Sequence, residues 1–399
     1  MSLREQFTLI IPTYNRPQEL ARLLGYLTRH AAAFSILVLD SSNDENKALN
    51  AALVPGTSLD IRLIACDPSM GPWEKFWRGS EEVKTEFCSL CADDDIILPD
   101  ALAPLTRFLR DHPDFSAAHG WYFSFYYADH VGITAVVYSS PSLDQDDPLL
   151  RLRDLFSRYE AITYGIYRAE AMRCALREVQ PVESPMAREL LGGALTVAMG
   201  KVARLPVFYY GRALGASHFY ERWHPIDYML TSPSQLFSEY SRYREILCKH
   251  LPEGRSGPKP SGDVSRLVDL IHMRYLSEYV KPEVMNYLIE EVLAGAARGD
   301  IMQGLWPRLH PAPSELVGSL RRSRLLRMVR DRLAPNLRLR HFSRWLGAAK
   351  DRTISAATFE GKARKYLLYR EFLAWLERED GGGAGGRLED VIRPMNSYE

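Results

Sequence analysis

The sequence predicts an α/β fold in which helices flank a mostly parallel sheet, followed by a C-terminal region that is mainly α-helical. Short apolar runs alternate with segments of helical spacing through residue 95, which is the pattern of a parallel sheet. A polar or acidic residue ends each run, as expected where a strand meets a ligand-binding loop. From Pro225 onward, helical spacing replaces this alternation. We therefore expect a first domain at residues 1–224 and a helical accessory domain at residues 225–399.

Composition and charge argue against several classes of protein. The 399 residues are 46% hydrophobic, which is ordinary for a soluble globular protein. Basic and acidic residues balance at 50 each, so the net charge gives no indication of nucleic-acid binding. No apolar run approaches the roughly 18 residues of a membrane-spanning helix. The five cysteines are odd in number and scattered, without a disulfide framework. These observations favour a cytoplasmic protein.

The first strand and helix are predicted near the N-terminus. Residues 7–12 form a continuous apolar run, typical of a strand covered on both faces. Pro17 stands near the first turn of a helix, and Asn15 is able to cap that helix. Four leucines at helical spacing predict its buried face: Leu20, Leu23, Leu24 and Leu27.

Two more strands and a helix follow in the same alternation. Residues 36–39 form an apolar run that ends at Asp40, and residues 61–65 form another. One face of the next helix is marked by Trp73, Phe76 and Trp77, with Ser80 as a further candidate. This spacing predicts that Lys75 and Arg78 lie on the opposite side of the helix.

Three adjacent carboxylates, Asp93, Asp94 and Asp95, interrupt the apolar segment at residues 87–100. Like charges at the end of a buried strand repel one another, so this position needs a positive partner. A hard divalent cation meets that need, and Mg²⁺ or Mn²⁺ commonly completes its shell with substrate phosphates. The triplet therefore indicates a metal–diphosphate site, with a solvated acidic loop as the alternative.

The predicted strand ends locate this site within the fold. Ligands on open parallel sheets bind at the carboxyl ends of the strands. Those ends are Thr13 with Tyr14, Asp40, and residues 93–95, which we expect to meet in one crevice. The first turn has no Gly-x-Gly-x-x-Gly, and the chain has no Gly-Lys-Ser/Thr. A dinucleotide-binding fold and a P-loop are therefore disfavoured.

Antiparallel pairing, a helix and a strand are predicted after the acidic triplet. Residues 115–138 are rich in aromatic and β-branched residues, as in antiparallel strands, and most of these aromatics are expected in the core. Residues 183–200 form a helical pattern closed by glycine, and residues 202–208 form a strand pattern. Residues 218–224 are either a lid or a surface loop.

The helical C-terminal region contains a cationic stretch. Residues 321–352 hold eleven Lys/Arg against two Asp, with apolar residues interspersed. Three interpretations are open: a solvated face, a peripheral contact with an anionic membrane leaflet, and a contact between copies in a homo-oligomer.

Five short segments occur in a defined order and spacing: residues 10–17, 38–40, 74–76, 92–100 and 164–168. Each segment is a weak signal alone, but their combination is specific. Together they resemble the family-2 glycosyltransferases of the GT-A fold, particularly the bacterial subgroup with an Asp-Asp-Asp metal motif. The resemblance covers about residues 7–224.

The resemblance implies roles for individual residues. The implied donor-binding set comprises Pro12, Thr13, Tyr14, Arg16, Asp40, Lys75, Asp93, Asp94 and Arg222. Within it, the first strand end and Asp40 hold the base and ribose, and Lys75 approaches the diphosphate. The implied metal ligands are Asp95, Asp93 and His218, with Asp95 the firmest. The implied cofactor is Mn²⁺ or Mg²⁺.

The catalytic base and the loop after Asp40 depart from the family pattern. The family usually has Glu-Asp at the start of the helix before its Gly-x-Val-x-x-Leu-Pro stretch. Met-Ala-Arg-Glu stands there in this chain, so Glu189 is the nearest match and Glu183 the reserve. Ser41 and Ser42 replace the Asp and Gly that usually follow Asp40.

The implied reaction is inverting transfer of a sugar from a nucleoside-diphosphate sugar, with a UDP-sugar favoured, to a hydroxyl of a saccharide or lipid-linked acceptor. Such a reaction serves bacterial surface-polysaccharide or glycoconjugate synthesis. Cations stabilise the leaving diphosphate while one carboxylate deprotonates the acceptor. A sugar-nucleotide pyrophosphorylase is the first alternative, disfavoured by the missing N-terminal Gly-rich loop. The second is a non-catalytic nucleotide-sugar-binding module, which requires Glu189 and Glu183 both to lie far from the donor.

Overall fold

The computed structural model describes residues 2–126, 132–138, 140–213, 233–251, 262–277, 282–297 and 300–301. Its strands are β1 (Phe7–Thr13), β2 (Ser35–Asp40), β3 (Asp60–Ala65), β4 (Phe87–Leu90), β5 (Ile96–Ile97), β6 (Phe115–Tyr126), β7 (Gly132–Tyr138), β8 (Ile166–Arg168) and β9 (Lys201–Ala213). Its helices are α1 (Leu3–Gln6), α2 (Pro17–Arg29), α3 (Asp44–Leu53), α4 (Pro72–Glu82), α5 (Leu102–Asp111), α6 (Pro148–Ser157), α7 (Ala169–Glu178), α8 (Pro185–Met199), α10 (Pro233–His250), α11 (Gly262–Ser277) and α12 (Pro282–Leu293).

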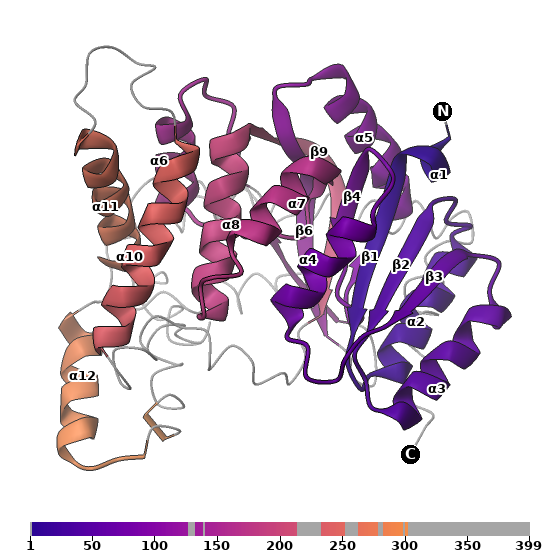
Figure 1. The fold of residues 1–399 in the computed structure, drawn as a ribbon, viewed down its shortest axis with the longest axis horizontal. Coiled ribbons are helices and arrows are strands. Elements are labelled where there is room, and N and C mark those ends of the chain that lie inside the picture. Colours follow the sequence, from indigo (N-terminus) through magenta and orange to yellow (C-terminus); the bar gives the residue numbers. More distant parts are fainter. Residues whose placement is uncertain are drawn as a thin grey trace, which may run out of the picture. The chain divides into compact units, whose positions relative to one another are not determined.

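The nine strands within the described residues form one sheet, in the order β3-β2-β1-β4-β8-β6-β9-β5, with β7 paired to β6 (Figure 1). The first four strands of the chain are parallel, and Thr13 ends β1 directly beside Asp40 at the end of β2. Strand β8 is antiparallel to β4 and β6, while β6 is parallel to β9. The predicted α/β fold is confirmed, because helices flank one mixed sheet.

The predicted antiparallel pairing in residues 115–138 is also confirmed. Strands β6 and β7 form an antiparallel pair. Of the aromatic residues of β6, Tyr122, Phe123 and Phe125 are completely buried, as expected for core positions.

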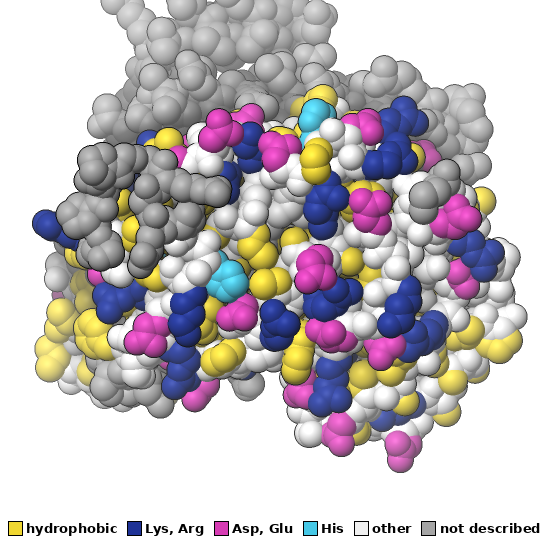
Figure 2. Space-filling model, turned by 45° about the horizontal axis from the view of Figure 1, so that its top comes forward, with side chains coloured by type: hydrophobic (Ala, Val, Ile, Leu, Met, Phe, Trp, Pro, Cys, Tyr) yellow, Lys and Arg dark blue, Asp and Glu magenta, His cyan; other side chains and the backbone are white. Residues whose placement is uncertain are grey.

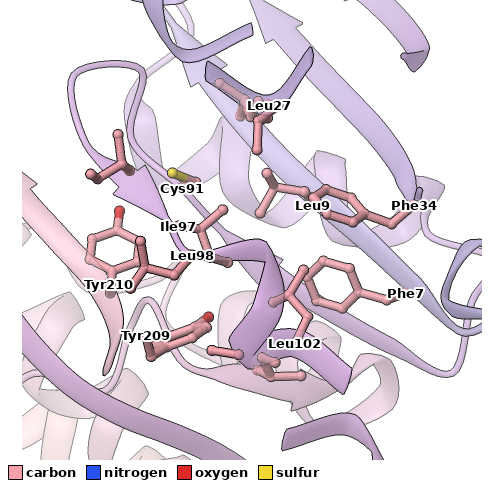
Figure 3. Close-up of a cluster of buried hydrophobic side chains, with 14 of the residues drawn as sticks. Phe7, Leu9, Leu27, Phe34, Cys91, Ile97, Leu98, Leu102, Tyr209 and Tyr210 are labelled. Carbon is pink, nitrogen blue, oxygen red and sulfur yellow. The ribbon is translucent and has the colours of Figure 1, made fainter. Parts of the chain in front are cut away.

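One face of the sheet packs against α2 and α5. The four leucines predicted to line the buried face of α2 are all at most 1% exposed. They belong to one cluster with alternate residues of β1 and the inner side of α5, part of which is drawn in Figure 3: Phe7, Leu9, Ile11, Leu102, Leu105 and Leu109. Strand β9 adds Tyr209 and Tyr210 to the same cluster, next to Ile97 and Leu98.

Helix α4 lies against the other face, and its inward side differs from the predicted one. Its buried residues are Trp73, Lys75, Gly79 and Ser80, whereas Phe76 and Trp77 are only half-buried. Gly79 permits close packing, because a Cβ atom there would lie 2.4 Å from Cδ1 of Leu39. Lys75 can face inward because its ammonium finds a backbone carbonyl 2.8 Å away. The prediction that Lys75 lies opposite the packed face is therefore wrong.

The helices after the sheet fall into two compact units. Helix α10, and α11 as far as Arg274, group with the sheet, whereas α12 belongs to a second unit. In the second unit, Val284 and Leu288 of α12 pack with Ile301. The mainly helical character expected after residue 225 is confirmed for the described residues. The domain boundary at residue 224 stays a prediction.

Surface composition agrees with the balanced charge of the sequence. On the face shown in Figure 2, Lys and Arg side chains are interspersed with Asp and Glu. Within the described ranges, every helix is too short or too polar to cross a membrane. The cationic stretch at 321–352 and the segment at 218–224 lie outside the described residues.

Candidate active site

The acidic triplet begins three residues after the end of β4, at the carboxyl end of the parallel strands. Asp93 is 4% exposed and Asp95 is 5% exposed, although each carries a carboxyl group. Oγ1 of Thr13, at the end of β1, donates a hydrogen bond to Oδ2 of Asp93 at 2.8 Å. This hydrogen bond therefore joins the end of β1 to the loop that follows β4.

Asp95 is held by the end of β9. The hydroxyl of Tyr210 donates to its Oδ2 at 2.9 Å, and the backbone N–H of Ala213 donates to its Oδ1 at 2.7 Å. The Tyr210 hydroxyl also accepts a hydrogen bond from the backbone N–H of Ala92 at 3.2 Å. Both carboxylate oxygens of Asp95 thus have fixed directions before any ligand binds.

Arg16 pairs with the other two carboxylates of the triplet. Its Nη1 lies 2.8 Å from Oδ2 of Asp94 and 3.4 Å from Oδ1 of Asp93. Burial lowers the pKa of Arg16, but the charges of Asp93 and Asp94 outweigh burial and raise the pKa overall. Arg16 is therefore a fixed positive charge at the rim of the acidic site.

One arginine does not balance the buried negative charge. Burial, and then the charge of Asp94, raises the pKa of Asp93 to about 7 and that of Asp95 to about 7. Such shifts indicate carboxylates whose ionised forms are under-compensated. Oxygen donors with surplus negative charge fit a hard divalent cation. In the part of the chain that is described, however, no three His, Cys, Asp or Glu side chains converge as a ready-made metal site.

Lys75 contributes a second cation at the same strand ends. Its Nζ donates to the carbonyl oxygen of Thr13 at 2.8 Å, and the side chain is 4% exposed. Burial lowers the pKa of Lys75, while nearby Asp93 and Asp40 oppose that shift. The carboxyl ends of β1, β2 and β4 therefore lie together, and Lys75 bonds the first of them. That they line a single crevice stays a prediction.

Asp40 is engaged by its own loop. Its Oδ1 accepts from the backbone N–H of Ser42, and its Oδ2 accepts from Nδ2 of Asn50, both at 2.8 Å. Asn15 joins the same network, because its Oδ1 accepts from the backbone N–H of Asn43 at 2.9 Å. Asn15 has φ of 54°, and the residue before α2 is Arg16, which makes no side-chain cap. The prediction that Asn15 caps α2 is therefore wrong: its side chain joins two loops.

Glu189 stands in the second turn of α8 and is half-buried. The hydroxyl of Tyr159 donates to its Oε1 at 3.3 Å. Burial raises the pKa of Glu189, and the charge of Arg212 together with the Tyr159 hydrogen bond lowers it in part. Glu183, the reserve candidate, is exposed.

Arg212 connects Glu189 electrostatically with the acidic triplet. Its charge acts on Asp95 as well as on Glu189. Burial raises the pKa of Tyr164, and the charges of both carboxylates raise it further. The Tyr164 ring stacks on that of Tyr210 with centroids 5.0 Å apart. Glu189 and Asp95 therefore border one region of the molecule.

Four residues of this site are absent from the sequence-based candidates: Tyr159, Tyr164, Tyr210 and Arg212. Two of them lie in β9, which continues to Ala213 instead of ending at Phe208. The Tyr209-Tyr210 pair was the available signal, since consecutive aromatics favour a longer strand. Nothing in the local pattern pointed to Tyr159.

The remaining candidates differ in how far the structure describes them. Tyr14 is 53% exposed, and its ring centroid lies 6.0 Å from Nζ of Lys75. Pro12 is half-buried in β1. His218 and Arg222 lie outside the described residues, so their roles stay predictions.

Residues 8–170 match the model of a protein family described as "Glycosyl transferase family 2". The protein is a glycosyltransferase, and the matched segment begins within β1 and contains the acidic triplet and β8. No curated protein matches the chain.

Two solved structures illustrate the similarity of fold. The chain is similar to TarS 1-349 of S. aureus in complex with UDP-GlcNAc, at 17% identity over 88% of this chain and 95% of that chain, with a TM-score of 0.48. It is also similar to the mannosyltransferase PcManGT from Pyrobaculum calidifontis in complex with GDP-Man and Mn²⁺, at 15% identity over 86% of each chain, with a TM-score of 0.43. Identities this low transfer neither substrate nor activity to this chain.

Proposed function

We propose that the protein is a metal-dependent, inverting glycosyltransferase that moves a sugar from a nucleoside-diphosphate sugar to a hydroxyl acceptor. A UDP-sugar is the favoured donor. The acceptor is a saccharide or lipid-linked saccharide used in bacterial surface-polysaccharide or glycoconjugate synthesis. One observation carries the proposal. The acidic triplet has more buried negative charge than its partners balance, and the charge of Arg212 acts both on Asp95 of that triplet and on a further half-buried carboxylate, Glu189.

The cofactor of this proposal is Mn²⁺ or Mg²⁺, held by Asp95 and Asp93 with His218 as a further ligand. When bound, the ion supplies positive charge to the departing diphosphate. In the same proposal, Lys75, Arg16 and Arg222 approach the diphosphate. The base and ribose contact Pro12, Thr13, Tyr14, Asp40, Asp93 and Asp94.

Glu189 is the base that we assign to the transfer step. Its carboxylate takes the proton of the acceptor hydroxyl while the acceptor oxygen forms a bond to the anomeric carbon. The bond from that carbon to the diphosphate oxygen breaks, and its electron pair leaves with the nucleoside diphosphate. Attack opposite the leaving group inverts the anomeric centre, so one base suffices and no enzyme nucleophile is needed.

A ligand panel tests this function directly. Nucleoside diphosphates and nucleotide sugars are compared with and without Mn²⁺, because a ligand that binds only the folded state raises its melting temperature. We expect UDP or a UDP-sugar to raise the Tm only with the metal, and slow metal-dependent release of nucleoside diphosphate to follow. Pyrophosphate-dependent formation of a nucleoside triphosphate would instead identify a pyrophosphorylase. Binding without any release over a full acceptor panel would identify a binding module.

We also propose that residues 321–352 bring a cytoplasmic enzyme to an anionic membrane leaflet, where a lipid-linked acceptor lies. Each basic residue near such a surface contributes about 1 kcal/mol. The variant with Arg321, Arg322, Arg324 and Arg327 replaced by Gln is therefore expected to stop co-sedimenting with anionic vesicles at low salt.

A matched variant controls for loss of charge alone. It replaces four exposed arginines of the sheet-containing unit by Gln: Arg4, Arg62, Arg153 and Arg177. This control should pellet like the wild type. Equal pelleting of all three proteins, or none from the wild type, would remove the membrane role and leave self-association or a solvated face.

A further inference from the structure

Two side chains of helix α10 form hydrogen bonds with the loop that leads into α8. Oε2 of Glu239 accepts hydrogen bonds from the backbone N–H groups of Glu183 at 3.0 Å and Ser184 at 3.2 Å. Nη1 of Arg242, one turn further along α10, donates to the carbonyl oxygen of Pro181 at 2.8 Å. Glu239 is only 7% exposed, so this carboxylate is buried against the loop.

The hydrogen bonds to Glu239 lie at the N-terminal end of α8. The N-terminus of a helix has unsatisfied N–H groups and the positive end of the helix dipole. Ser184 is the N-cap residue, and its own Oγ already accepts from the N–H of Ala187. Glu239 satisfies two further N–H groups and places a negative charge there, from a helix that lies more than fifty residues away in the chain. Without that carboxylate the loop loses the acceptor that fixes it.

The same loop is tied to α8 through Arg188, the residue before Glu189. Arg188, the neighbour of Glu189, donates to the carbonyl oxygens of Val182 and Gln180. Gln180 in turn donates to the carbonyl oxygen of Trp73 at 3.2 Å, on the helix that carries Lys75. A shift of this loop would therefore move the first two turns of α8, and Glu189 with them.

We propose that Glu239 and Arg242 are positioning residues for sugar transfer: by fixing the loop before α8, they set the place of Glu189 relative to the donor. This inference rests on the proposed function and gives α10 a part in it. Misplacing a catalytic group by about 1 Å can cost on the order of 10²-fold in rate. The proposed donor contacts that the structure describes, other than Lys75, lie at the strand ends, and Lys75 is held by the carbonyl oxygen of Thr13 and not by the loop, so donor affinity should not change.

The test compares kcat, donor Kd and melting temperature for Glu239→Ala, Glu239→Gln and Arg242→Met. We expect Glu239→Ala to lower kcat by about 10- to 100-fold with donor Kd within about twofold of wild type. Glu239→Gln keeps a carbonyl oxygen for both N–H groups and should recover most of that loss. Arg244→Ala is the matched control, because Arg244 on the same helix pairs with Asp269 instead of the loop. It should keep the wild-type kcat.

Hydrogen exchange gives a readout that does not depend on turnover. The amides of Glu183 and Ser184 should exchange faster in Glu239→Ala than in the wild type, and at the wild-type rate in Arg244→Ala. Should Glu239→Ala fail to fold, the Arg242→Met variant tests the positioning role instead. The side chain of Arg242 is half-exposed, so its replacement should cost little stability. It is expected to lower kcat without changing donor Kd.

Three possible results distinguish this inference from the proposed function. If the wild type is active and the folded variants Glu239→Ala and Arg242→Met have the same kcat, the positioning role alone is overturned. Parallel falls in kcat and in the fraction of protein that binds donor would also overturn it, by showing a purely structural role. A wild type without metal-dependent transfer would overturn both.

Discussion

Replacing Asp95 by alanine is expected to abolish metal-dependent donor binding and to leave the fold intact. The wild-type carboxylate is held in place by Tyr210 and Ala213, each of which bonds one of its oxygens. Alanine leaves two donors without their partner, at about 1–3 kcal/mol each. It also removes a buried carboxylate whose pKa is raised to about 7, which offsets that loss.

The offset depends on pH in a defined direction. The folded-state pKa of Asp95 lies above the ordinary value of 3.8, so the ionised carboxylate destabilises the folded protein. That destabilisation is absent well below pH 4, grows between pH 4 and 7, and reaches a few kcal/mol at most by the conversion of about 1.4 kcal/mol per pH unit. In EDTA, the Tm of Asp95→Ala should therefore rise relative to wild type as the pH increases from 5 to 8.

Calorimetric titration of nucleoside diphosphate with and without Mn²⁺ measures the loss of binding. Asp100→Ala is the matched control, because Asp100 lies five residues further on and is exposed. The control should bind like the wild type. Unchanged Mn²⁺-dependent binding by a folded Asp95→Ala would show that the metal site lies elsewhere.

Patterns that depend on burial were predictable from the sequence. The four leucines of α2 and the apolar run of β1 have one low-energy arrangement, with their side chains in the core. The carboxyl ends of parallel strands must also lie at one edge of the sheet, so Thr13, Asp40 and the acidic triplet could be placed together.

The direction of polar side chains was not predictable in the same way. Lys75 is turned inward because the carbonyl of Thr13 and the packing of Gly79 are available, and both depend on how α4 meets the sheet. Asn15 similarly bonds to the loop after β2 instead of capping α2. Long-range hydrogen bonds of this kind leave no periodic signal in the chain.

The contacts made by the carboxyl end of β9 at the site were likewise not predictable from the sequence. Tyr210 and Arg212 reach Asp95 and its surroundings from more than one hundred residues away in sequence. Their role arises from the pairing of β5 with β9, which places Ile96 beside Gly211. The sequence alone contained the residues but not this register.

Replacing Glu189 by glutamine should preserve donor binding and lower turnover by about 10² to 10⁴-fold, the usual effect of losing a general base. Glutamine keeps the length of the side chain and can still accept the hydrogen bond from Tyr159, so α8 should keep its position. The amide cannot take the proton of the acceptor hydroxyl. Single-turnover rates at saturating donor, together with donor Kd, separate loss of chemistry from loss of binding.

Glu183→Gln is the matched control for this variant, since Glu183 is the exposed alternative base. Near-normal turnover in Glu183→Gln, with loss in Glu189→Gln, assigns the base to Glu189, and the reverse pattern assigns it to Glu183. The acid limb of kcat/KM adds an independent check. Tyr159 donates to Glu189 and lowers its pKa, so Tyr159→Phe should move that limb to higher pH. An unmoved limb would mean that the titrating base is a group other than Glu189.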